Sequence, residues 1–184
     1  MTSPHVVPSF SGSRTARAVL PGLCFAVVTL LFGFGLGVVF GLNEDAIKSR
    51  LTASASVVSA TVYKDDAKAV TAVLDKSWAY MQRAHLHAGG LGATAIALSL
   101  VVVLLGTGPL VARLVSLGLG VGSLGYSVFW LWAGFRAPSL GSTGAAKESL
   151  AWLAIPASGM VVASTAAVAL LIVGAMMRRE APME

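Results

Sequence analysis

Long uncharged hydrophobic stretches alternate with polar segments along the chain. Four stretches contain no Asp, Glu, Lys, Arg or His: Ala18–Leu42, Ala88–Gly106, Leu114–Phe135 and Leu150–Met177. A hydrocarbon core of about 30 Å is crossed by about 20 apolar residues in a helix. Inside lipid the backbone must satisfy its own polar groups, and unbroken apolar runs do so as helices. The pattern therefore predicts an all-α polytopic membrane protein with a four-helix transmembrane domain over residues 18–177.

The segment between the first two stretches, residues 43–87, has its own helical periodicity. Its hydrophobic residues recur every three or four positions: Ile47, Leu51, Ala55, Val58 and Val62, then Val70, Leu74, Trp78, Met81 and His85. This spacing places each set on one face of a helix, and Asp65 and Asp66 can cap the second helix. We expect a helical hairpin that projects from the membrane. The alternative is that both helices lie flat on the lipid surface.

Charges at the ends of the first stretch predict the orientation. Arg14 and Arg17 precede it without any acidic residue, whereas Glu44 and Asp45 follow it. Flanking basic residues stay in the cytoplasm, and the first span usually dominates. We therefore expect cytoplasmic termini and an extracytoplasmic hairpin, although eight basic residues lie on the hairpin side. Residues 1–17 and 178–184 are predicted to be tails, with the N-terminal one mobile.

A cleaved signal peptide is a poor explanation for the first stretch. Its apolar run is 25 residues long, whereas signal peptides have apolar cores of about 7–15 residues. We expect it to be retained as a membrane anchor.

Small residues recur every four positions on three of the predicted spans: Gly33, Gly37 and Gly41; Gly118 and Gly122; Gly159, Ala163 and Ala167. Such stripes let helix backbones approach closely in lipid. The spacing predicts packing among the four spans of one chain. A stripe left over could instead bind a second copy or another membrane subunit.

Composition removes several classes of function. The net charge of +5 comes from basic residues scattered at helix ends, without a basic stripe, so nucleic acid is not an expected partner. The single cysteine, Cys24, cannot form a disulfide or a thiolate zinc site within one chain. Acids and bases are absent from the middle of the spans, which disfavours an ion pathway through one molecule.

The strongest chemical signal lies where the hairpin enters the second span, in the string Arg83-Ala-His-Leu-His87. Neutral imidazole ligates heme iron, copper or zinc, so His85 and His87 are candidate cofactor-binding residues. Residues two apart point about 200° apart on a helix. The two rings therefore cannot hold one metal ion, and a heme or metal site would need a ligand from another subunit.

A polar cluster is the other interpretation of this region. If the first two spans are neighbours, Glu44 and Asp45 would face Arg83, His85 and His87, and an ion pair there would fix the hairpin. Histidines at the headgroup level of the membrane are the simplest alternative. A partly desolvated group of acid, base and imidazole is also what proton transfer or quinone binding needs. No catalytic residue is predicted.

Two strings, Gly41-Leu-Asn-Glu-Asp-Ala-Ile-Lys48 and Arg83-Ala-His-Leu-His-Ala-Gly-Gly-Leu-Gly92, resemble those of small uncharacterised bacterial four-helix integral membrane proteins. The resemblance implies a bacterial inner-membrane location and carries no activity. The expected function is a non-enzymatic subunit, assembly factor or scaffold of a membrane complex, without a cofactor. The alternatives are a heme- or metal-binding redox protein that uses His85 and His87, and an oligomeric small-solute transporter or channel.

Overall fold

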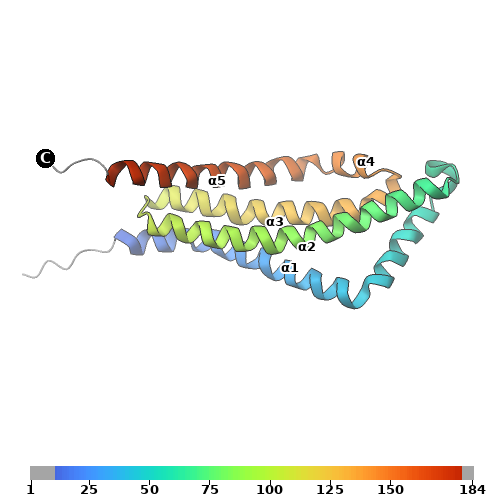
Figure 1. Cartoon of the computed structure of the whole chain (residues 1–184), viewed down its shortest axis with the longest axis horizontal. Helices are drawn as coiled ribbons and strands as arrows, with labels where there is room; N and C mark the ends of the chain where they lie inside the picture. Colours follow the sequence, from blue (N-terminus) through green and yellow to red (C-terminus); the bar gives the residue numbers. More distant parts are fainter. Residues whose placement is uncertain (1–10, 180–184) are drawn as a thin grey trace, which may run out of the picture.

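The computed structural model describes residues 11–179, and nearly all of them are helical (Figure 1). The elements are α1 (Ser11–Ser56), a π-helical turn η1 (Ser59–Tyr63), α2 (Ala67–Leu104), α3 (Pro109–Leu140), α4 (Thr143–Glu148) and α5 (Ala151–Arg179). Helices α1, α2, α3 and α5 are long and apolar enough to cross a membrane. The predictions of an all-α fold and of four helices able to span a membrane are thus confirmed. Of the predicted tails, residues 1–10 and 180–184 lie outside the described part.

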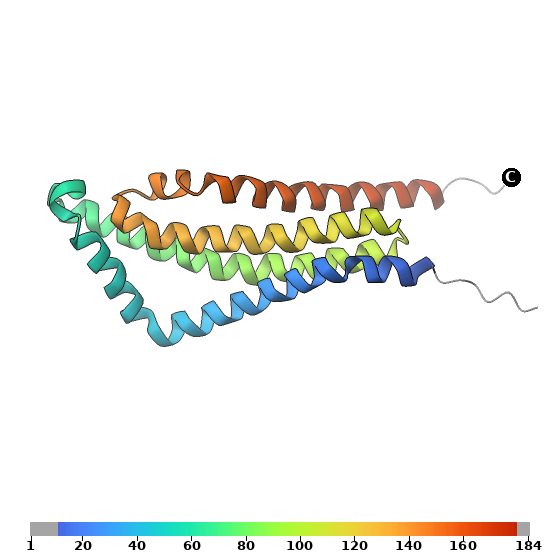
Figure 2. The ribbon, with the colours of Figure 1, turned by 180° about the vertical axis from the view of Figure 1, so that it is seen from behind.

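Three of the long helices form the core, and the fourth packs beside it. Helices α1, α2 and α3 contact one another extensively, whereas α5 packs along α3 and meets α2 at only a few positions. The two ribbon views show α5 along the edge of the molecule, next to α3 (Figures 1 and 2). A large hydrophobic face of α5 is therefore left exposed, as lipid contact requires.

Glycines set the distance between α1 and α3. A Cβ atom added to Gly120 would overlap the carbonyl oxygen of Gly22, and one added to Gly22 would overlap the backbone of Ser116. The two backbones are therefore in direct contact, which only residues without a side chain allow. Neither glycine belongs to the predicted small-residue stripes.

The predicted stripes differ in their use. Gly33 and Gly37 face α2, while Gly118 and Gly122 face α5. Gly41 and Gly159 meet nothing within 4 Å. Ala163 is exposed and Ala167 half-buried on α5. Ala167 packs against the core cluster that contains Leu119 and Val168. Intramolecular packing thus accounts for five of these eight residues, and Gly159 and Ala163 lie on the outer face of α5.

Helix α1 bends sharply at Asn43, whose backbone leaves the helical region with φ −131° and ψ 24°. Beyond the bend, residues 44–56 return toward the start of α2, so that α1 and α2 enclose a wedge (Figure 2). The predicted inward face is buried at Leu51 and Ala55. This helix ends at Ser56, earlier than the predicted Val62, and η1 continues the chain.

Hydrogen bonds between distant segments fix both ends of the molecule. At one end, the Thr15 hydroxyl donates to the carbonyl oxygen of Thr107 in the α2–α3 turn at 2.8 Å. At the other, the buried Tyr63 hydroxyl donates to the Pro138 carbonyl near the end of α3 at 2.7 Å. Burial raises the pKa of the Tyr63 phenol, because the charged phenolate would be poorly solvated there. Asp66 caps α2, as predicted from the sequence.

Candidate functional site

His85, on α2, faces α1 and is hydrogen-bonded to it. Its Nδ1 lies 2.8 Å from the carbonyl oxygen of Gly33. Because a carbonyl only accepts, Nδ1 carries the proton. A Cβ atom on Gly37 would lie 2.8 Å from Cε1 of the imidazole, so glycine at that position makes room for the ring. His85 is therefore a packing residue between two helices, with Nε2 not engaged in this bond.

His87 faces α3 and packs against aromatic rings. Its imidazole centroid lies 5.2 Å from the ring of Tyr126 and 6.1 Å from that of Trp130. As the helical geometry predicts, His85 and His87 contact different neighbouring helices. The two rings do not form one site within this chain.

Glu44 and Asp45 lie at the bend of α1, apart from Arg83 and both histidines. Glu44 forms an ion pair with Lys48, one turn later, with both side chains about half exposed. This is the only ion pair among the residues that the structure describes. The expected pairing of these acids with Arg83, His85 or His87 is therefore not observed. Helix α1 diverges from α2 up to the bend at Asn43, so the acids next to the bend lie away from α2 (Figure 2).

Arg83 lies instead on aromatic rings where α2, α3 and α4 meet. Its guanidinium carbon is 5.4 Å from the Tyr80 ring centroid and 5.1 Å from that of Trp130. The Lys147 ammonium on α4 lies 6.0 Å from the same Tyr80 ring. The Tyr80 and Trp130 rings meet edge to face at 4.8 Å. Both cations thus lie against the same pair of packed aromatic rings. We call these four residues the cation–aromatic cluster: Tyr80, Arg83, Trp130 and Lys147.

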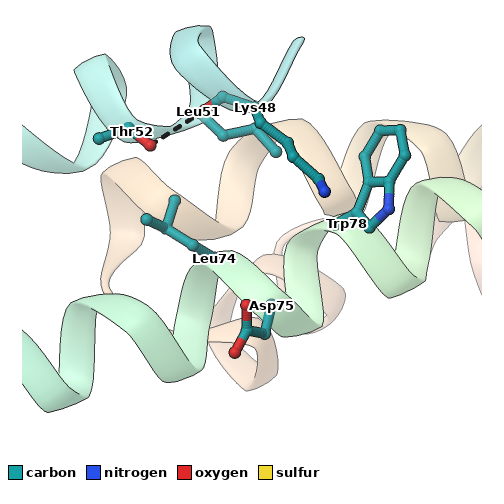
Figure 3. Close-up of a pocket in the computed structure, with 6 residues that line it drawn as sticks. All are labelled: Lys48, Leu51, Thr52, Leu74, Asp75 and Trp78. Carbon is teal, nitrogen blue, oxygen red and sulfur yellow. Dashed lines mark hydrogen bonds between the residues drawn. The ribbon is translucent and has the colours of Figure 1, made fainter. Parts of the chain in front are cut away.

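A second polar feature is a cleft of about 420 Å³ inside the wedge between α1 and α2. Figure 3 shows Lys48 reaching from α1 toward Trp78 on α2, and its ammonium lies 5.3 Å from that ring centroid. The remaining lining residues are Leu51, Thr52, Leu74 and Asp75. The cleft is open, with hydrophobic and charged groups on both sides.

Sequence reasoning identified Arg83 but missed its partner Lys147. The shared face of Tyr80, Arg83 and His87, with spacings of three and four, was the available signal for part of this group. Lys147 follows the third span in a segment rich in Gly, Ser and Ala, where no periodicity indicated a helix. There α4 forms over six residues, capped by the Ser142 hydroxyl, and brings Lys147 to Tyr80.

Among the described residues, three or more His, Cys, Asp or Glu side chains do not come together as a metal site would require. Comparisons with protein-family models, with curated proteins and with solved structures found no match.

Proposed function

We propose that this chain is a non-enzymatic integral membrane protein that serves as a subunit, assembly factor or scaffold of a membrane complex. In this proposal it resides in the bacterial inner membrane with both termini in the cytoplasm. Residues 43–83, which we call the outer hairpin, lie outside the cytoplasm and bind the partner. The observation that carries the proposal is that this hairpin is both long and braced.

Chain reversal alone does not need such a segment. The same protein joins α2 to α3 with the four residues 105–108, within the usual length of connections between packed helices. The outer hairpin uses about ten times as many residues. Such a length supports a role for the hairpin beyond connecting two spans.

The contacts that hold the outer hairpin in place support a docking role. Tyr63 is hydrogen-bonded to α3, and Leu51 and Met81 pack in one buried cluster. The hairpin also carries exposed charges of both signs, among them Arg50, Lys68 and Asp75. A surface ordered before binding loses less conformational entropy when a partner docks.

Site-specific photo-crosslinking in native membranes tests the proposal. A photoreactive amino acid at Val57, which is 85% exposed near the hairpin tip, should give a discrete protein adduct. The matched control is Leu170 on the outer face of α5, 73% exposed, where contact with lipid should give no discrete adduct. The captured protein should also copurify in a fixed ratio. Absence of adducts at Val57, together with solute flux in liposomes containing the pure protein, would replace the proposal with transport.

Thiol labelling tests the orientation separately. In a Cys24→Ser background, a membrane-impermeant maleimide added to intact spheroplasts should label Lys68→Cys in the hairpin. It should label Gly108→Cys in the α2–α3 turn only after the membrane is opened. The reverse pattern would invert the topology and leave the docking test unaffected.

One observation favours heme or metal binding as a second candidate. A histidine whose Nδ1 donates to a backbone carbonyl presents Nε2 for ligation, as metal-bound histidines do, and His85 has this arrangement. The ligand opposite would have to come from another subunit. Under our main proposal the purified protein is colourless and metal-free. Near-stoichiometric cofactor that is lost in His85→Ala and retained in His87→Ala would establish the second candidate instead.

A further inference from the structure

We infer that the cation–aromatic cluster binds the phosphate of an anionic phospholipid at the membrane surface. Arg83 and Lys147 would hold the phosphate, and Tyr80 and Trp130 would form the aromatic base beneath it. Tyr80 and Arg83 stand at the membrane end of the outer hairpin, whereas Val57 and Lys68 lie near its tip, where a protein partner is proposed to bind.

The first argument is depth in the membrane. Arg83 precedes the uncharged stretch of α2 by five residues and Lys147 precedes that of α5 by three. At roughly 1.5 Å per residue, Arg83 stands about 7–8 Å beyond the start of the uncharged stretch of α2. Lys147 lies on α4, which ends just before α5 begins. The headgroup layer on each side of a bilayer is about 5–8 Å thick. Both cations are therefore at the level of lipid phosphates.

The second argument is charge. Among residues 14–178, neither Arg83 nor Lys147 has a carboxylate within ion-pair distance, since Glu44 and Lys48 form the only such pair. The two cations approach the same ring, so they stand no farther apart than the sum of their distances to its centroid. A guanidinium fork binds two phosphate oxygens, and a lysine adds a mobile point charge. A phosphate monoanion carries the negative charge and the acceptor oxygens that both kinds of donor bind.

The third argument distinguishes a lipid from a soluble phosphate. Tyrosine and tryptophan rings concentrate at the headgroup level because one end of each is apolar and the other polar. Tyr80 belongs to a hydrophobic cluster with Phe129 and Leu150. Leu86, one turn from Arg83 toward the span, is 65% exposed. The site therefore opens onto an apolar surface where acyl chains can lie.

Lipid titration followed by native mass spectrometry tests the inference on the full-length protein. Phosphatidylglycerol should bind more tightly than phosphatidylcholine of the same chain length. The double variant Arg83→Gln/Lys147→Gln should lower that preference by about 25-fold, because one basic residue contributes about fivefold at an anionic membrane surface. The matched control, Lys68→Gln/Lys76→Gln, removes the same charge from the outer hairpin and should retain the preference.

A third variant separates charge from folding. Arg83→Lys/Lys147→Arg keeps both charges, so it should retain most of the preference for phosphatidylglycerol. Equal binding of the two lipids by the native protein would overturn the inference, as would an equal loss in the control variant. Millimolar inorganic phosphate that competes fully with phosphatidylglycerol would reassign the site to a soluble anion and likewise overturn it.

Discussion

Replacing Tyr63 by Phe should loosen the tip of the outer hairpin without unfolding the protein. The substitution removes only the hydroxyl, which donates to the Pro138 carbonyl at 2.7 Å from a buried position. A net intramolecular hydrogen bond contributes about 0.5–1.5 kcal/mol. The Pro138 carbonyl keeps a longer bond from the Gly141 amide at 3.4 Å. We therefore expect the cost to lie near the middle of that range, about 1 kcal/mol.

The same tyrosine predicts how this difference changes with pH. Burial raises the folded-state pKa of Tyr63 above its ordinary value of 10.0. The folded state therefore favours the protonated phenol. Its contribution to stability is complete below about pH 10 and is lost as the pH rises through the raised folded-state pKa. The variant has no phenol to ionise, so its disadvantage should shrink above pH 10.

Hydrogen exchange at residues 59–66 measures this opening directly, because the tip can open without global unfolding. Exchange there should be about fivefold faster in the variant at neutral pH, the equivalent of about 1 kcal/mol. Tyr126→Phe is the matched control, since no hydrogen bond from its hydroxyl is seen among the described residues. Equal protection in the native protein and in Tyr63→Phe would refute the proposed role of this bond. A difference that grows above pH 10 would refute the assigned direction of the pKa shift.

Two further predictions concern packing and capping. Gly120→Val should force α1 and α3 apart and lower the free energy of unfolding in SDS by about 1–3 kcal/mol or more. Gly159→Val, on an open surface, should lower it by less than about 0.5 kcal/mol. Similar losses for both variants would contradict the assigned helix contact. Asp66→Ala removes the side chain that accepts from two backbone amides at the start of α2, so it should cost about 1 kcal/mol and speed exchange in residues 67–70, while Asp65→Ala should leave that cap intact.

The sequence was sufficient for features set by local pattern. An uncharged run long enough to cross lipid has few alternatives to a helix, and the four spans are present. Likewise, the spacing that placed Leu51 and Ala55 on an inward face depends only on helical periodicity, and both residues are buried. Helix α3 continues to Leu140, beyond the uncharged stretch that ends at Phe135, because a charged residue such as Arg136 ends the apolar run without ending the helix.

Features that depend on the direction of a helix were harder to predict from the sequence. The ion-pair prediction for Glu44 assumed only that the first two spans are neighbours. They are, but α1 has diverged from α2 where it bends at Asn43, and Glu44 pairs with Lys48 one turn later on its own helix. Gly22 and Gly120 were missed although each also belongs to small residues repeated every four positions: Ala18, Gly22 and Ala26, and Ala112, Ser116 and Gly120. Which of several such stripes is in contact depends on where two helices cross. The opposite directions of His85 and His87 were predictable, since helix geometry alone determines them.

The bend in α1 offers a test of whether local sequence or tertiary contact determines its angle. Trp78 touches both arms: its ring lies 5.3 Å from that of Phe40 before the bend and 5.3 Å from the Lys48 ammonium after it. An aromatic pair contributes about 0.5–1.5 kcal/mol and an exposed cation–π contact about 0.5–1 kcal/mol. Asn43 itself makes only an exposed hydrogen bond to the Val39 carbonyl at 3.3 Å.

Trp78→Ala should therefore release residues 44–56, the arm of α1 beyond the bend, whereas Asn43→Ala should leave the bend in place. Spin labels at Ser49→Cys and Thr71→Cys, in a Cys24→Ser background, report the distance between the arm and α2. We expect a single narrow distance distribution in the otherwise native protein and in Asn43→Ala, and a broad one in Trp78→Ala. Broadening in Asn43→Ala alone would show that the angle is set within α1. The angle of the bend would then not depend on contact with α2, and the Lys48–Trp78 contact would be a consequence of the bend rather than its cause.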